Sequence, residues 1–437
     1  MDQSDTGRHL GDAVSMRLLG IGPITGGNEM EGILRRVYAW GRGSLDSITT
    51  PSDIVPERTI IAESAELLPS LLDSDLCGPG ALILCPSPHA AVLTRGTTVF
   101  PYAGSLSAVG DEILLGEGLV VEVQEYAATH ELTVIGPTLT RIASENDFRS
   151  FIYDADRAKE YGSFPLVLLD PMVQLCDLCV LGGAHLCGGP RRRLLVTLAG
   201  EVKTTPFGTT LGGVEDGLSS ISASWKFRRR PPGSGCPVCL SQVVPLATVD
   251  AAHQQRPWLS RYLHALNALR SAAEAGLTDL DVSGFGGRLI PELTPVRATA
   301  DFTLAASDSP ILLFNSHIAL LHDPRSKRQF QLGPSAARLV ELMLVYGDHD
   351  AAADAAVLHL EVAPYTAHSA LTQVTRRLAG NGITLIGSRG MRGSGPTESS
   401  WPRDHDAVSS QDPFNEWLSQ AVAPSRLRPR IPRPKSG

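Results

Sequence analysis

Short apolar segments alternate with glycine, proline and polar residues through most of this chain of 437 residues. In the first part, residues 59–62, 81–84 and 119–123 each have the length and the flanking turns of a β-strand. A longer segment at 144–161 begins with a serine that suits a helix start and carries charges along its length. Residues 17–165 are therefore predicted to form a mixed α/β region with a mainly antiparallel sheet.

Residues 166–304 are rich in glycine and hold most of the cysteines. From about residue 256, apolar side chains recur at helical spacing, which predicts one helix with a buried face. The members of this stripe are Trp258, Leu259, Tyr262, Leu263, Leu266 and Leu269.

The clearest pattern lies near the C-terminus. Apolar segments at 311–314, 317–321 and 328–332 are joined by tight polar turns and predict a small sheet. Helical patterns follow from Pro334, from about 350 and from about Pro364, and a proline suits the first position of a helix. The fold class that we expect is α+β, with a mixed α/β N-terminal region and a C-terminal winged-helix domain made of a three-stranded sheet plus three helices.

Changes in pattern also predict the domain boundaries. Residues 389–437 are dominated by glycine, serine, proline and arginine, which is typical of a disordered segment. The expected divisions are a disordered N-terminus at 1–16, a mixed α/β domain at 17–165, a cysteine-containing domain at 166–304, the C-terminal domain at 305–388 and a disordered tail at 389–437.

Composition narrows the functional classes. The net charge of −8 argues against a dedicated nucleic-acid-binding protein, whose domains carry a positive excess. No apolar run is long enough to span a membrane, and the polar first 20 residues are unlike a secretory signal. We therefore expect a cytoplasmic protein, in which cysteines are reduced or bind metal.

Two C-x-x-C pairs are the strongest chemical signal. Four thiolates suit tetrahedral zinc, so we expect a structural zinc ion and no other cofactor. His185 and Cys187 are alternative ligands, and the competing interpretation is a set of buried, inert cysteines. The predicted metal ligands are Cys176, Cys179, Cys236 and Cys239.

No set of residues indicates catalysis. The glycines at 20, 22 and 26 have the wrong spacing for a dinucleotide fingerprint, and no Walker A, H-E-x-x-H or G-x-S-x-G motif occurs. We therefore expect a protein that is not an enzyme.

The stretches "ILLFNSHIALLHDPRSKRQFQLGPSAARLVELML" and "SALTQVTRRLAGNGITLIG" resemble the PqqD-like domain. This domain is the recognition element of pathways that make natural products from ribosomal peptides (RiPPs). The resemblance implies that the leader of a precursor peptide adds as a strand beside the third strand and contacts the third helix. An exposed strand edge suits such capture of a peptide. The peptide-binding residues that it implies are Lys327, Arg328, Phe330, Leu332, Leu371, Val374, Thr375 and Leu378.

Other stretches leave alternatives open. "GCPVCLSQVV" and "RPWLSRYLHAL" resemble the ThiF-like partners of azoline-forming cyclodehydratases, whereas "VIGPTLTRIASENDF" and "FPLVLLDP" resemble the recognition proteins of daptide-type clusters. Both resemblances imply a precursor peptide and the modifying enzymes of its pathway as partners. A second alternative is a winged-helix regulator that reads DNA with Arg376 and Arg377. The apolar groove residues have an alternative role too, which is to close the core of the domain itself.

Overall fold

A computed structural model of the chain describes residues 27–43, 58–86, 92–94, 96–116, 118–129, 134–182, 187–228, 235–296 and 309–385. The predicted disordered ends, 1–16 and 389–437, lie outside the described residues. The chain divides into two compact units, of which the first comprises Met1–Phe151 and Met172–Gln255. The second comprises Ile152–Pro171 and Arg256–Gly437.

These boundaries differ from the predicted ones at 165 and 304. The first division falls inside a single helix, α5 (Glu145–Tyr161), whose final turns belong to the second unit. The second unit also takes in residues 256–296, because strand β12 (Asp281–Ser283) pairs with the C-terminal sheet. Sequence pattern marks the elements but not the long-range pairing that assigns them to a unit.

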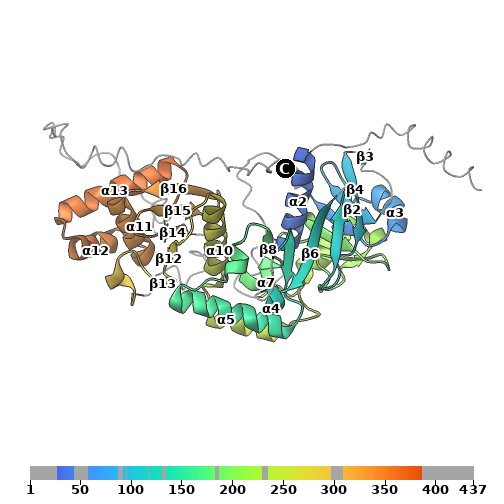
Figure 1. Ribbon diagram of the computed structural model, residues 1–437, viewed down its shortest axis with the longest axis horizontal. Coiled ribbons are helices and arrows are strands. Elements are labelled where there is room, and N and C mark those ends of the chain that lie inside the picture. Colours follow the sequence, from blue (N-terminus) through green and yellow to red (C-terminus); the bar gives the residue numbers. More distant parts are fainter. Residues whose placement is uncertain are drawn as a thin grey trace, which may run out of the picture. The chain divides into compact units, whose positions relative to one another are not determined.

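The first unit contains an 11-stranded sheet with the order β11-β10-β9-β1-β2-β4-β5-β6-β7-β8, and β3 pairs with β4 (Figure 1). Strands β9, β1, β2 and β4 run parallel, as do β6, β7 and β8, whereas β4, β5 and β6 are antiparallel. The sheet is therefore mixed, and the expectation of a mainly antiparallel sheet was wrong. Its strands are β1 (Thr59–Ala62), β2 (Leu82–Pro86), β3 (Val92–Thr94), β4 (Thr97–Gly104), β5 (Glu112–Leu115), β6 (Leu119–Glu125), β7 (Thr138–Arg141), β8 (Val173–Leu175), β9 (Arg193–Val196), β10 (Glu201–Lys203) and β11 (Gly212–Gly213).

Helix α2 (Gly27–Arg42) covers one face of this sheet. Val37 and Trp40 on α2 are buried against sheet residues that include Leu84 and Val123. The indole nitrogen of Trp40 donates to the carbonyl of Leu194 over 2.9 Å, so the helix is also fixed by a buried hydrogen bond. The other helical segments of this unit are η1 (Ala65–Leu67), α3 (Leu68–Asp73), α4 (Tyr126–Thr129), α7 (Leu178–Gly182), η3 (Gly189–Arg191), η4 (Val214–Asp216), α8 (Gly217–Arg228) and α9 (Leu246–Gln255).

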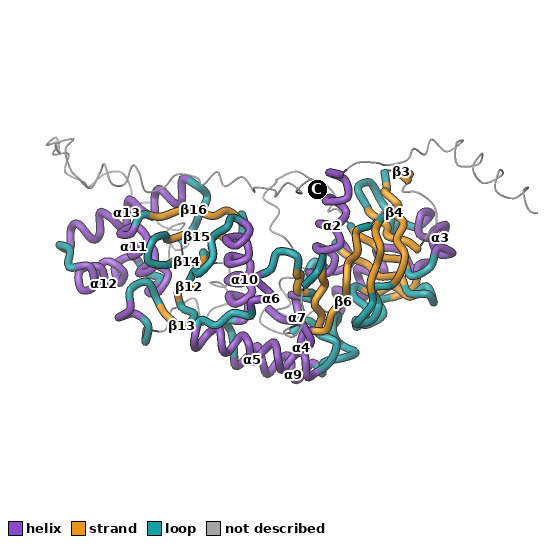
Figure 2. The backbone as a smooth tube through the Cα atoms, in the orientation of Figure 1, coloured by secondary structure: helices purple, strands orange, loops and turns teal. Residues whose placement is uncertain are grey.

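The second unit has a five-stranded sheet with the order β13-β12-β14-β15-β16 (Figure 2). The three strands predicted near the C-terminus pair antiparallel, β12 also pairs antiparallel with the first of them, and only β12 and β13 run parallel. The remaining strands are β13 (Gly286–Gly287), β14 (Ile311–Phe314), β15 (Ala319–Asp323) and β16 (Arg328–Leu332). The helical segments are α6 (Leu166–Leu169), α10 (Leu259–Glu274), η5 (Pro291–Leu293), α11 (Pro334–Tyr346), α12 (His349–Leu360) and α13 (Pro364–Gly380).

Helices α11, α12 and α13 share one apolar core with the sheet of the second unit. The first of them starts with Pro334 and ends at Gly347, whose φ of 69° suits glycine because it lies in the left-handed region. The predicted buried face of α10 is confirmed, since its leucines and Tyr262 are buried. Described helices and sheets together agree with the expected α+β class.

No described helix has both the length and the apolar character needed to cross a membrane.

Candidate functional site

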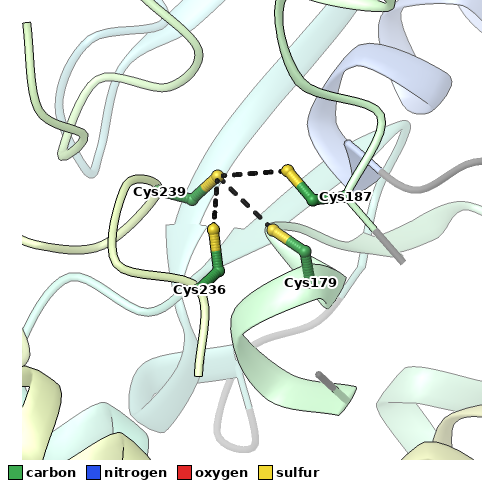
Figure 3. A group of neighbouring side chains, drawn as sticks. All are labelled: Cys179, Cys187, Cys236 and Cys239. Carbon is green, nitrogen blue, oxygen red and sulfur yellow. Dashed lines mark hydrogen bonds between the residues drawn. The ribbon is translucent and has the colours of Figure 1, made fainter. Parts of the chain in front are cut away.

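Four buried cysteines of the first unit gather their sulfur atoms at one point (Figure 3). Cys179 lies on α7, and Cys187 follows a few residues beyond that helix. Cys236 and Cys239 lie at the two ends of a tight turn after α8. The four Sγ atoms are all within 4.8 Å of one another, and each side chain is at most 6% exposed. This four-cysteine group can hold a metal ion.

The spacing of the sulfurs fits a tetrahedral ion. A Zn–S bond of about 2.3 Å places neighbouring sulfurs of a tetrahedron roughly 3.8 Å apart. The Sγ atom of Cys239 lies 3.4 Å from that of Cys179, 3.7 Å from that of Cys236 and 4.0 Å from that of Cys187. All four cysteines are free rather than paired in disulfides. The donor set is therefore the right type, number and size for a closed structural metal site.

Without a cation, the four thiols share protons unevenly. Hydrogen bonding with Cys187 raises the pKa of Cys179 well above its ordinary value, and the same contact lowers the pKa of Cys187 well below it. A bound cation would remove this competition, because a coordinated thiol is deprotonated.

Three of the four predicted ligands are in the group, but Cys176 is not, and Cys187 takes its place. Cys176 follows β8 directly and packs in the core under α2, where its sulfur lies close to Gly41. The next residue, Asp177, has a φ of 55°, and this left-handed turn directs the chain into α7 before Cys179. The two sulfurs of the first C-x-x-C pair therefore lie in different places, one in the core and one in the four-cysteine group. Burial raises the pKa of Cys176 to about 11, so that thiol stays neutral.

His185, the other alternative ligand, lies outside the described residues. The competing interpretation, a set of buried, inert cysteines, describes Cys176 and Cys85, whereas the four other sulfurs are grouped closely enough to hold a metal ion.

Arg193 on β9 lies beside the four-cysteine group and contacts one of its sulfur atoms. Its Nη2 atom donates to Sγ of Cys239 over 3.4 Å and to Oδ1 of Asp177 over 2.7 Å. Its Nη1 atom donates to the carbonyls of Trp40 and Gly41, both over 2.9 Å. Burial by itself would lower the pKa of Arg193, but Asp177 and Cys239 beside it raise the pKa well above its ordinary value. The guanidinium therefore stays charged beside the sulfurs.

Two further contacts involve Cys239 and Arg193. The hydroxyl of Thr204 lies 3.6 Å from Sγ of Cys239. Gly43, with a φ of 61°, ends α2 beside Arg193, and a Cβ atom there would lie only 2.1 Å from the guanidinium carbon. Glycine at 43 is what allows the guanidinium to lie against the end of α2. Hydrogen bonds from residues around the ligands orient those ligands in metal sites.

The turn that carries Cys236 and Cys239 is fixed by its neighbours. The amide of Gly235 donates to Oδ1 of Asp250 over 3.0 Å, and a Cβ atom at 235 would lie 2.3 Å from Val249. The amide of Thr209 donates to the carbonyl of Val238, inside the turn, over 2.9 Å. The C-x-x-C spacing was visible in the sequence, whereas these supporting contacts were not.

A second candidate site is the free edge of the sheet in the second unit. Strand β16 is the last strand in the sheet order, and among the described residues it pairs with β15 only. Its outer backbone groups therefore have no strand partner in the described part of the chain.

The hydrogen-bond register identifies these outer groups. The amide of Asn315 donates to the carbonyl of Ile318, which continues the ladder between β14 and β15. In an antiparallel ladder bonded pairs alternate, so Leu320 and His322 bond toward β14, and the residues between them bond toward β16. Their partners on β16 are Arg328, Phe330 and Leu332. The backbone groups of Gln329 and Gln331 consequently point away from β15, and the side chain of Gln329 donates to the carbonyl of Ala268 over 2.9 Å.

Most of the predicted groove residues belong to the domain core instead. Phe330, Leu332, Leu371, Val374 and Leu378 are each at most 4% exposed and lie in one cluster with α11 and α12. The alternative role of Leu371, Val374 and Leu378 was to close the core of the domain itself. Their position agrees with that role. They line the space between β16 and α13 from the inside and leave little apolar surface for a peptide.

The polar members of the predicted set lie nearer to solvent. Lys327 and Arg328 are exposed at the start of β16, and Thr375 is partly buried on α13. The guanidinium carbon of Arg328 lies 4.8 Å from the centre of the Phe330 ring, and its Nη1 atom donates to the carbonyl of Asn381 over 3.4 Å. Arg328 thus connects the edge strand to the end of α13.

Comparison with known proteins finds no matching family model, no matching curated protein and no matching solved structure.

Proposed function

We propose that this chain binds the leader of a ribosomally made precursor peptide along the free edge of β16 and presents it to modifying enzymes. In this proposal residues 305–388 act as a PqqD-like winged-helix domain, and the protein is a cytoplasmic adaptor rather than an enzyme. The observation that carries the proposal is the position of β16 at the end of the sheet order, where in the described part of the chain it pairs with β15 only and the backbone of Gln331 is directed outward.

Backbone pairing alone gives modest affinity. The backbone of Gln331 offers up to two hydrogen bonds, each contributing roughly 0.5–1.5 kcal/mol. Ordering each residue of the incoming peptide costs about 1–2 kcal/mol. Side-chain contacts must therefore supply the net binding energy. Because the apolar groove residues are already buried, we assign this role to Lys327 and Arg328, which suit acidic residues of the leader, and to Thr375.

Proline at position 331 tests this proposal most sharply. Gln331 is exposed, and its amide points away from β15, so proline removes the outward donor without removing a ladder bond. Fluorescence polarisation would measure binding of the full chain to labelled peptides synthesised from short reading frames beside its gene. We expect Gln331→Pro to bind about tenfold more weakly, which corresponds to roughly 1.4 kcal/mol.

Gln331→Ala is the matched control, because it keeps the backbone donor and should bind like the unsubstituted chain. Equal affinity of Gln331→Pro and Gln331→Ala would show that the peptide does not pair with this edge. Substitution of Val374 is not a clean test, because this residue is 4% exposed and its loss would disturb the core.

We also propose that the four-cysteine group holds structural zinc. Sulfur spacing near that of a tetrahedral site and complete burial support zinc over a solvated, exchangeable ion. A ThiF-like partner of a cyclodehydratase would also contain zinc, so zinc content does not separate the two functions. Leader binding at β16 does separate a recognition domain from the alternative of a DNA-binding regulator. If the protein were a DNA-binding regulator, Arg376 and Arg377 of α13 would give salt-sensitive binding to duplex DNA.

A further inference from the structure

Two histidines and one aspartate converge at the junction of α12 and α13. His349 and Asp350 lie in the first turn of α12, and His368 lies in the second turn of α13. The Nδ1 atoms of His349 and His368 lie 3.7 Å and 3.8 Å from Oδ1 of Asp350, and the ring centroids are 5.7 Å apart. We propose that this His349–Asp350–His368 cluster is a second metal site, which takes a divalent transition-metal ion.

The separations suit an ion more than direct hydrogen bonds. Both nitrogen–oxygen distances exceed the range of a normal hydrogen bond. Ligand bonds of about 2.0–2.2 Å would place the donors roughly 3.0–3.5 Å apart, a contraction of a few tenths of an ångström. Side-chain exposures of 31%, 86% and 45% leave His349, Asp350 and His368 free to make this adjustment.

The surroundings of His349 accommodate the tautomer that a metal ligand needs. Its Nε2 atom lies 3.2 Å from the hydroxyl of Thr372, one turn beyond His368 on α13. With the proton on Nε2, the ring donates to Thr372 and presents its Nδ1 lone pair toward Asp350. Metal-bound histidines commonly use their second nitrogen in this way. Thr372 is therefore a positioning residue for the cluster.

Charge also permits a cation here, although the N-terminus of a helix repels one. Asp350 belongs to the cluster itself, and Asp348 caps α12 by accepting from the amides of Asp350 and Ala351 over 3.0 Å. These two carboxylates offset the helix dipole. Two imidazoles and one carboxylate suit zinc, nickel, cobalt or copper, with water in the remaining positions. A thiolate site such as the four-cysteine group selects softer chemistry, so the two sites are distinguishable.

The test is a nickel titration, measured by isothermal titration calorimetry, of the full chain without a histidine tag and loaded beforehand with a single equivalent of zinc for the four-cysteine group. We expect one further equivalent of nickel to bind, and we expect His368→Ala to lose it. Cys187→Ser should retain this nickel site, because the four-cysteine group is separate from it. His317→Ala is the matched control, since His317 is an exposed histidine of the same unit outside the cluster.

A bound ion that joins α12 to α13 also raises the melting temperature by mass action. We expect nickel to stabilise the unsubstituted chain and His317→Ala but not His368→Ala. Unchanged nickel binding in His368→Ala, or absence of the further equivalent in the unsubstituted chain, would overturn the proposal. Neither result depends on peptide binding at β16.

Discussion

The guanidinium of Arg193 and the carboxylate of Asp177 form a 2.7 Å ion pair in which each side chain is only 1% exposed. The same guanidinium contacts Cys239 and the carbonyls that end α2. This pair therefore links the four-cysteine group, the strand β9 and the covering helix in one buried polar network. A buried charge that loses its partner is far more costly than an exposed one.

Arg193→Ala should lower the free energy of unfolding of the first unit by about 3–5 kcal/mol, because it leaves Asp177 buried without its partner. Urea denaturation followed by tryptophan fluorescence measures this loss. The control is Arg149→Ala, which breaks an exposed pair with Glu145 on α5 and should cost less than about 1 kcal/mol. Similar losses of unfolding free energy in the two variants would show that the buried ion pair of Arg193 does not stabilise the first unit more than an exposed pair does.

Serine at position 187 should abolish binding of the metal, whereas serine at position 176 should leave it intact. Cys187 supplies one of the four grouped sulfurs, and Cys176 lies in the core under α2. The measurement is zinc released on denaturation of each purified variant, detected with a colorimetric chelator. Retention of zinc by Cys187→Ser together with its loss in Cys176→Ser would show that Cys176, as predicted from the sequence, is the fourth ligand.

The stability of the second unit should decrease as the pH falls through the titration of His322. Burial lowers the pKa of this histidine to about 4, and His264 and Lys327 act in the same direction, whereas Asp323 opposes them. The unfolded chain therefore binds the proton first, from about pH 6.5 downward. Stability is fully present above that pH and is lost between about pH 6.5 and 4, by roughly 3 kcal/mol at most.

Urea denaturation at a series of pH values tests this dependence. His322→Gln should flatten the curve between pH 4 and 6.5, because glutamine does not titrate. His317→Gln should leave the curve unchanged, since His317 is exposed. A flat curve in the unsubstituted chain would mean that His322 has an ordinary pKa.

Glu341→Ala should destabilise the second unit by about 3 kcal/mol. This carboxylate on α11 is fully buried and accepts from the hydroxyl of Ser283 over 2.6 Å and from the amides of Leu289 and Ile290 over 2.8 Å and 2.6 Å. Its removal leaves the buried amide of Ile290 and the partly buried amide of Leu289 without this acceptor, and an unsatisfied buried group costs about 1–3 kcal/mol.

Thermal unfolding should also rank Glu341→Gln between the unsubstituted chain and Glu341→Ala, because the amide oxygen can still accept. Glu292→Ala on η5 is the control, since Glu292 is exposed. If Glu341→Ala has the same melting temperature as the control, the residues from 283 to 290 are held by other contacts.

The order of elements near the C-terminus was readable from the sequence, and two strands were placed at their observed limits, 311–314 and 328–332. Periodicity and turn residues act over a few positions, so they predict where a strand or helix begins. They do not predict whether neighbouring strands run parallel, and the first sheet proved to be mixed. The crossovers between parallel strands depend on packing across the sheet.

The sequence also supplied the ligand chemistry, since three of the four grouped cysteines belong to its C-x-x-C pairs. The choice of Cys187 over Cys176 was decided by the tertiary structure, because a left-handed turn at Asp177 and the buried contacts of Arg193 set where each sulfur lies. In the same way, the sequence placed the apolar residues Phe330 on the third strand and Val374 on the third helix of the C-terminal pattern. Only the packing of α11, α12 and α13 decided that these side chains complete the core, because burial depends on residues distant in the chain.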